Sequence, residues 1–147
     1  MIESAIIEDN ALMNIEEDHY NNLFNGRLCP SINADNKKNR KEFPFQAMWE
    51  LFVYAAVLGI NTGRAKKINK QHKPFRWGNI GHSHKKNLLL LATAKNNSLE
   101  FLKDGDTVKK TIEEYANGGL AIINQEIKNN PSAYTSLEDL THRFMEG

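Results

Sequence analysis

The most strongly apolar part of the sequence is Phe45-Gln-Ala-Met-Trp-Glu-Leu-Phe-Val-Tyr-Ala-Ala-Val-Leu58. Its apolar side chains recur at intervals of three and four residues and also fill much of the space between, which is typical of a helix buried on most sides. The longest apolar run, residues 47–60, contains Glu50 and covers 14 positions. Because a membrane-spanning helix needs roughly 20 apolar residues, this stretch predicts the central helix of a folded core and no membrane association.

Helical patterns on both sides of this stretch predict the remaining elements. Asn14 can cap a helix over residues 15–24, and further helices are expected over residues 84–94, 97–103, 106–129 and 136–145. The pair Gly118-Gly119 lies inside the apolar stripe of the longest one, where close approach of a neighbouring helix is favoured over a break at Asn117. We therefore expect an all-α fold, a compact single-domain bundle of about five or six helices around the apolar helix 45–58. Residues 1–147 would form this one helical domain, with residues 1–13 as a loosely attached N-terminal arm.

Cysteine content and the N-terminal residues indicate where the protein works. Cys29 is the single cysteine in 147 residues, which excludes a disulfide within the chain and a cysteine-based zinc cluster. The first ten residues are acidic and lack the basic start and apolar core of a signal peptide. Both observations predict a cytoplasmic protein.

Charge is divided unevenly along the chain although the net charge is only +1. Residues 36–95 hold thirteen Lys or Arg against two Glu, and no Asp or Glu occurs between Leu51 and Leu99. The remainder holds six basic and sixteen acidic residues. A basic middle between acidic ends is informative about binding partners even when the total charge is not.

The basic middle is the main candidate for a binding site, because several cations on one surface can neutralise nucleic-acid phosphates and release counterions. The competing interpretation is a solvated surface loop. Phe75 and Trp77 could stack on exposed bases, although a role in the edge of the core is favoured for them. The candidate phosphate-binding residues are Arg64, Lys66, Lys67, Lys70, Lys73 and Arg76, with Lys85 and Lys86 as an extension.

Other residue patterns do not indicate catalysis or metal binding. His82 and His84 are too few for a zinc site, which needs four ligands or three and a water. Glu113 and Glu114 are neighbours on a predicted helix, so their side chains diverge by about 100° and cannot flank one reacting atom. Phosphate-cradling glycine loops and hydrolase motifs are missing from the sequence. We expect no enzymatic activity, no metal and no cofactor.

The order of several segments resembles a known protein family. The stretch from Phe45 to Gly59, a glycine-containing basic loop, Phe75-Arg-Trp77 and Glu113-Glu-Tyr-Ala-Asn-Gly-Gly-Leu120 are similar to small proteins associated with bacterial DNA phosphorothioation (Dnd) systems. The likeness covers roughly residues 43–129, and the segment at residues 113–120 is its most specific part. The resemblance implies an accessory protein of an anti-phage DNA-modification or restriction system. It does not assign a catalytic role to any residue of this chain.

Two functions follow from these observations. The leading hypothesis is a non-catalytic accessory protein whose basic middle binds DNA phosphates without sequence preference. The alternative is a protein–protein adaptor subunit of a defence complex, which docks its basic middle on acidic partners or self-associates. A small hydrolase would require polar residues that converge in one pocket.

Overall fold

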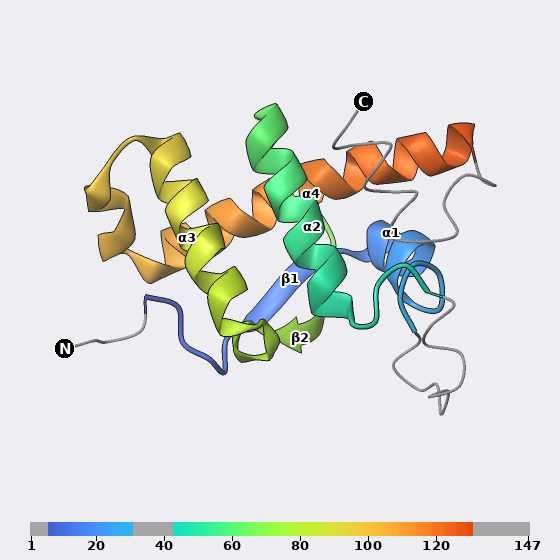
Figure 1. Cartoon of the computed structure of the whole chain (residues 1–147), viewed down its shortest axis with the longest axis horizontal. Coiled ribbons are helices and arrows are strands. Elements are labelled where there is room, and N and C mark those ends of the chain that lie inside the picture. Colours follow the sequence, from blue (N-terminus) through green and yellow to red (C-terminus); the bar gives the residue numbers. More distant parts are fainter. Residues whose placement is uncertain (1–5, 31–42, 131–147) are drawn as a thin grey trace.

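The computed structural model describes residues 6–30 and 43–130 (Figure 1). In this part of the chain, four α-helices accompany one two-stranded sheet, and short π- and 3-10-helical turns connect them. The elements in chain order are β1 (Leu12–Glu16), α1 (Glu17–His19), a π-helical turn (Tyr20–Phe24), α2 (Met48–Thr62), β2 (Gln71–Arg76), a 3-10 turn (Trp77–Asn79), α3 (His82–Asn96), a 3-10 turn (Leu99–Lys103) and α4 (Gly105–Asn129).

The expectation of an all-α bundle of five or six helices is wrong, because β1 and β2 form an antiparallel sheet. Met13 pairs with Phe75 and Ile15 with His72, so two residues of β2 stand opposite Asn14 alone. This is a β-bulge, and Pro74 lies in it. A proline lacks the N–H that a regular ladder uses, and a bulge is one of the places in a sheet that tolerates it.

The N-terminal helix expected over residues 15–24 begins later than predicted. Asn14 does not cap it but lies in the middle of β1, and helical structure starts at Glu17. The alternation of buried Met13 and Ile15 with less buried neighbours is the pattern of a strand. Residues 6–13, which belong to the expected N-terminal arm, include the buried side chains of Ile7 and Met13.

The predictions for the longer helices are confirmed with small shifts. The central helix, expected at 45–58, is α2, and the helices expected at 84–94 and 106–129 are α3 and α4. Asn97 ends α3 in a left-handed conformation (φ 58°), so the helix expected over residues 97–103 does not begin there. Instead, Ser98 caps the following turn through the N–H of Glu100, at 3.1 Å. The helix predicted at 136–145 lies outside the described residues.

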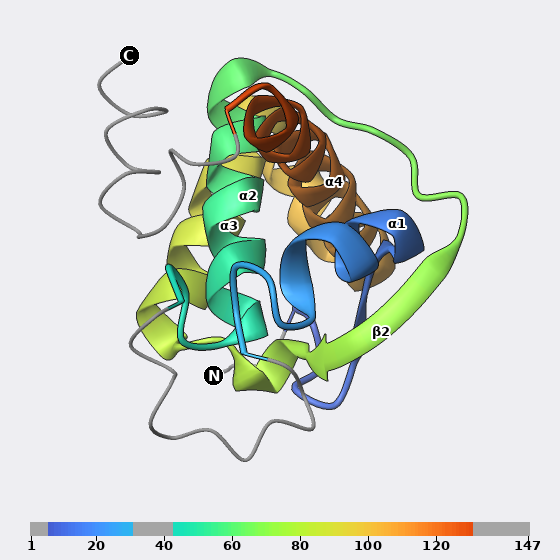
Figure 2. The ribbon, with the colours of Figure 1, turned by 90° about the vertical axis from the view of Figure 1, so that its right-hand side faces the viewer.

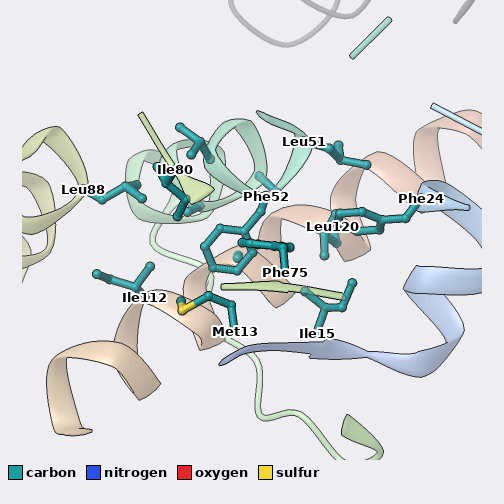
Figure 3. Close-up of a cluster of buried hydrophobic side chains, with 14 of the residues drawn as sticks. Met13, Ile15, Phe24, Leu51, Phe52, Phe75, Ile80, Leu88, Ile112 and Leu120 are labelled. Carbon is teal, nitrogen blue, oxygen red and sulfur yellow. The ribbon is translucent and has the colours of Figure 1, made fainter. Parts of the chain in front are cut away.

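The core is built where α2 crosses α4 and where the sheet packs beneath this pair (Figure 2). Phe52 of α2 meets Phe75 of β2 edge to face, with 5.2 Å between ring centroids, and Met13 and Leu120 pack around them (Figure 3). None of the helices in residues 6–30 and 43–130 combines the length and apolar character needed to span a bilayer.

Glycine residues allow the backbones of α2 and α4 to come into direct contact. A Cβ atom at Gly119 of α4 would overlap the carbonyl oxygen of Ala55, and one at Gly59 of α2 would overlap that of Tyr115. α4 continues unbroken through Gly118-Gly119. The favoured interpretation of this pair, close approach of a neighbouring helix, is therefore confirmed.

Candidate nucleic-acid interface

Residues 64–70 form an extended segment that joins the end of α2 to β2 and runs along the outer side of α4 (Figure 2). Its backbone is fixed to the helix. The N–H of Lys66 donates to the carbonyl oxygen of Glu114 at 2.9 Å, and the Asn117 amide donates to the carbonyl oxygens of Lys66 and Lys67, both at 3.1 Å. Because the carbonyls point at α4, the segment is held in place while its lysine side chains stay exposed.

The far end of this segment is held by Glu16 at the end of β1. Its carboxylate accepts the N–H groups of Asn69 and Lys70, both at 2.9 Å. Burial acts to raise the pKa of Glu16, but these two amides, with the nearby positive charge of Lys66, outweigh it and lower the pKa. Glu16 is therefore ionised at neutral pH and serves as an anchor for the segment.

Five of the eight predicted phosphate-binding residues lie in this segment or just after it. Arg64, Lys66, Lys67 and Lys70 follow one another along it, and Lys73 lies just beyond on β2. All five residues are exposed. We refer to this set, with its backbone from residue 64 to residue 73, as the basic ridge.

The other three predicted cations lie outside residues 64–73. Arg76 is exposed at the end of β2, while Lys85 and Lys86 belong to α3, which lies on the opposite side of α4 from the extended segment (Figure 2). Lys85 also pairs with Asp9 at 3.2 Å. Lys85 and Lys86 therefore do not extend the basic ridge.

Acidic residues of β1 and α1 offset part of the charge of the ridge. Lys70 contacts Glu17 at 3.0 Å in a pair that is largely exposed, and the hydrogen bond from Lys70 to Glu17 raises the pKa of the lysine. Exposed pairs of this kind contribute little to stability, so a phosphate could replace the carboxylate as partner of Lys70. His19, which lies buried near Lys66, adds no positive charge, because burial first and the charge of Lys66 second lower the pKa of its imidazole.

Lysines of α4 form a second charged region, which the sequence patterns did not single out. Lys109 and Lys110 lie beside Lys67 around a hollow of about 470 Å³, together with Asp106, Glu113 and Glu114. Three lysines and three carboxylates line this hollow, so its positive and negative charges balance. The helical repeat of Asp106, Lys109, Lys110 and Glu113 was the signal available in the sequence.

Glu113 has a structural position in this region. It is buried, and its Oε2 accepts the backbone N–H of Asn14 at 2.6 Å, the Asn14 side-chain amide at 3.0 Å and the Lys109 ammonium at 2.8 Å. The backbone N–H of Asn14 can donate to Glu113 because Asn14 lies at the β-bulge of the sheet. Glu113 therefore joins α4 to β1.

The aromatic residues beside the ridge belong to the core. Phe75 and Trp77 are only 8% and 3% exposed, so neither face is free to stack on a base. The favoured prediction for this pair is thus confirmed. Within residues 6–30 and 43–130, no three His, Cys, Asp or Glu side chains converge as a metal site would require.

Comparison with known families identifies the chain. The model of the family described as DNA sulphur modification system-associated protein 4 matches residues 32–144, more than three quarters of the sequence. The chain belongs to this family. The resemblance to Dnd-associated proteins drawn from the sequence is thereby confirmed. Comparisons with curated proteins and with solved structures gave no match.

Membership of the DNA sulphur modification system-associated family agrees with an accessory role in that system. The matched residues include the whole ridge and all of α4.

We expect Cys29 of this Dnd-associated protein to be unreactive while the chain is folded. The thiol is fully buried, and burial, followed by the charge of Glu50, raises its pKa to about 12. At pH 8 the reactive thiolate is then roughly 10³-fold scarcer than in a free cysteine. Ellman's reagent should label the denatured chain within seconds and the native chain only at the rate of unfolding. Equally fast labelling of both forms would contradict the burial of this side chain.

Proposed function

We propose that this chain is a non-catalytic accessory protein of a bacterial DNA sulphur-modification system and that it binds DNA phosphates through the basic ridge. The observation that carries the proposal is the fixed, extended backbone from residue 64 to residue 73, which presents five exposed cations. The family association with DNA sulphur modification supports DNA as the polyanion.

Physical properties of the ridge favour phosphate contact over simple solvation. Asn117 and Glu16 already hold the backbone, so binding would order only the ends of the lysine and arginine side chains. Less conformational entropy is then lost for each contact that forms. The ridge contains no base-reading motif and its aromatic neighbours are buried, so the expected recognition depends on charge and not on sequence.

Binding can be measured by fluorescence anisotropy with labelled duplexes of two unrelated sequences. If all five cations contact phosphates, affinity should fall roughly 10²–10³-fold between 50 mM and 200 mM salt. The Arg64→Glu/Lys67→Glu variant should bind at least about tenfold more weakly, with a salt dependence shallower by about two phosphate contacts.

The matched control is Lys86→Glu/Lys103→Glu, which makes the same change in net charge at exposed positions away from the ridge. This variant should retain most of the affinity, and both variants should keep the helical circular dichroism of the wild type. Equal losses in the two variants would show that only total charge matters. Failure of the wild type to bind at 50 mM salt would exclude DNA binding by the ridge.

A further inference from the structure

A hollow of about 300 Å³ lies on the outer face of α2, beside the start of α3. Its lining includes Phe45, Trp49, Glu50, Val53, Tyr54 and His84. Ala55 and Gly59, which meet α4, lie on the opposite side of the helix, as the 3.6-residue repeat requires. The hollow is therefore separate from the basic ridge, which packs on the outer side of α4.

Aromatic rings form most of its walls. Phe45 and Tyr54 meet edge to face with 5.5 Å between ring centroids, and Trp49 lies 5.6 Å from the ring of His84. Aromatic faces carry partial negative charge and attract cations, tryptophan most strongly. A hollow bounded by several such rings prefers a flat organic cation to a plain alkyl group.

Glu50 supplies a negative charge at the same place. It is half-buried in the lining, and no residue in the described ranges gives its carboxylate a hydrogen bond or an ion pair. It is also the last acid before Glu100, in the otherwise basic middle of the chain. A half-buried carboxylate that has no hydrogen-bond or ion-pair partner among residues 6–30 and 43–130 favours binding of a cation that can also donate hydrogen bonds.

We propose that this hollow binds the guanidinium group of an arginine side chain presented by a partner protein. A guanidinium is planar, so it can stack on Trp49 or Tyr54, and its paired N–H donors match the two oxygens of Glu50. The volume accommodates one such side chain. This site would give the protein a docking point for another protein, independent of any DNA contact by the ridge.

The test uses the full chain and an isolated probe, N-acetyl-arginine methylamide, at constant ionic strength. Trp49 and Trp77 are the two tryptophans of the sequence, and their indole N–H signals can be followed by NMR. We expect a saturable, millimolar shift of the Trp49 signal, while buried Trp77 serves as internal reference and stays unchanged. The neutral analogue with citrulline in place of arginine should bind at least about fivefold more weakly.

Variants assign the interaction to the carboxylate. Glu50→Gln should remove most of the preference for arginine over citrulline, whereas Glu100→Gln, at an exposed acid paired with Lys103, should leave it unchanged. A Trp49 signal that does not shift, equal binding of both probes, or full binding by Glu50→Gln would each overturn the proposal. Tighter binding of the corresponding lysine amide would overturn the assignment to arginine.

Discussion

Replacing Gly119 by alanine is expected to destabilise the protein by about 3 kcal/mol or more, the upper range for overpacking a core. A Cβ atom at this position would overlap the carbonyl oxygen of Ala55, which is backbone and cannot rotate away. α2 and α4 would have to move apart, and the side chains packed around their crossing would lose contacts. Urea denaturation followed by circular dichroism would measure the free energy of unfolding.

The sign of this effect makes the experiment decisive. Helix propensity alone predicts the opposite result, a gain of about 1 kcal/mol for alanine over glycine within a helix. Gly81→Ala, at the N-cap of α3, is the control for adding a methyl group without a backbone clash, because the nearest atom to a Cβ there belongs to the movable side chain of His84 at 3.3 Å. It should cost less than about 1 kcal/mol. A stabilised Gly119→Ala protein would mean that the two helices do not touch at backbone distance.

Replacing Glu113 by alanine is expected to cost about 3–5 kcal/mol, the range for removing one partner of a buried ion pair. The change would leave the Lys109 ammonium, whose side chain is 19% exposed, and the bulge N–H of Asn14 without their acceptor. Since Glu113 joins α4 to β1, both the pair and the attachment of the strand would be lost. Thermal and urea denaturation would both report the loss.

Two further variants would show whether the carboxylate of Glu113 causes this loss of stability. Glu113→Gln keeps an oxygen that can accept the Asn14 N–H and loses only the charge, so its loss should be clearly smaller than that of Glu113→Ala. Glu114→Ala changes the neighbouring residue, whose backbone carbonyl and not its carboxylate holds Lys66. It should cost less than about 1 kcal/mol. Equal effects at positions 113 and 114 would show that the carboxylate of Glu113 is not the attachment point.

Local periodicity was enough to predict α2, α3 and α4, because each keeps apolar residues at intervals of three and four over several turns. The sheet could not be predicted in this way. β1 has only five residues, and its partner begins at Gln71, more than fifty positions later. β2 contains Pro74 and exposed polar residues, which count against a strand unless the bulge is known.

The candidate interface was predictable as a set of cations but not as a surface. Sequence order places Arg64 through Lys73 together, and the extended backbone keeps them so. It could not show that α3 carries Lys85 and Lys86 to the other side of α4 (Figure 2). Nor could it show that Asn117 and Glu16 hold the ridge, since those hydrogen bonds join residues 50 or more positions apart.

The pairing of β1 with β2 bears on where a minimal fragment of this protein can be cut. The family match starts at residue 32, yet β1 and the turn after it precede that point and supply the fully buried Met13, Ile15 and Phe24. A fragment trimmed to residues 32–144 would retain every residue of the family match. It would lack β1, so β2 would have no partner strand and the apolar side chains that β1 covers would be exposed to solvent. The buried core thus extends beyond the residues of the family match, and an expressed fragment should begin well upstream of residue 32.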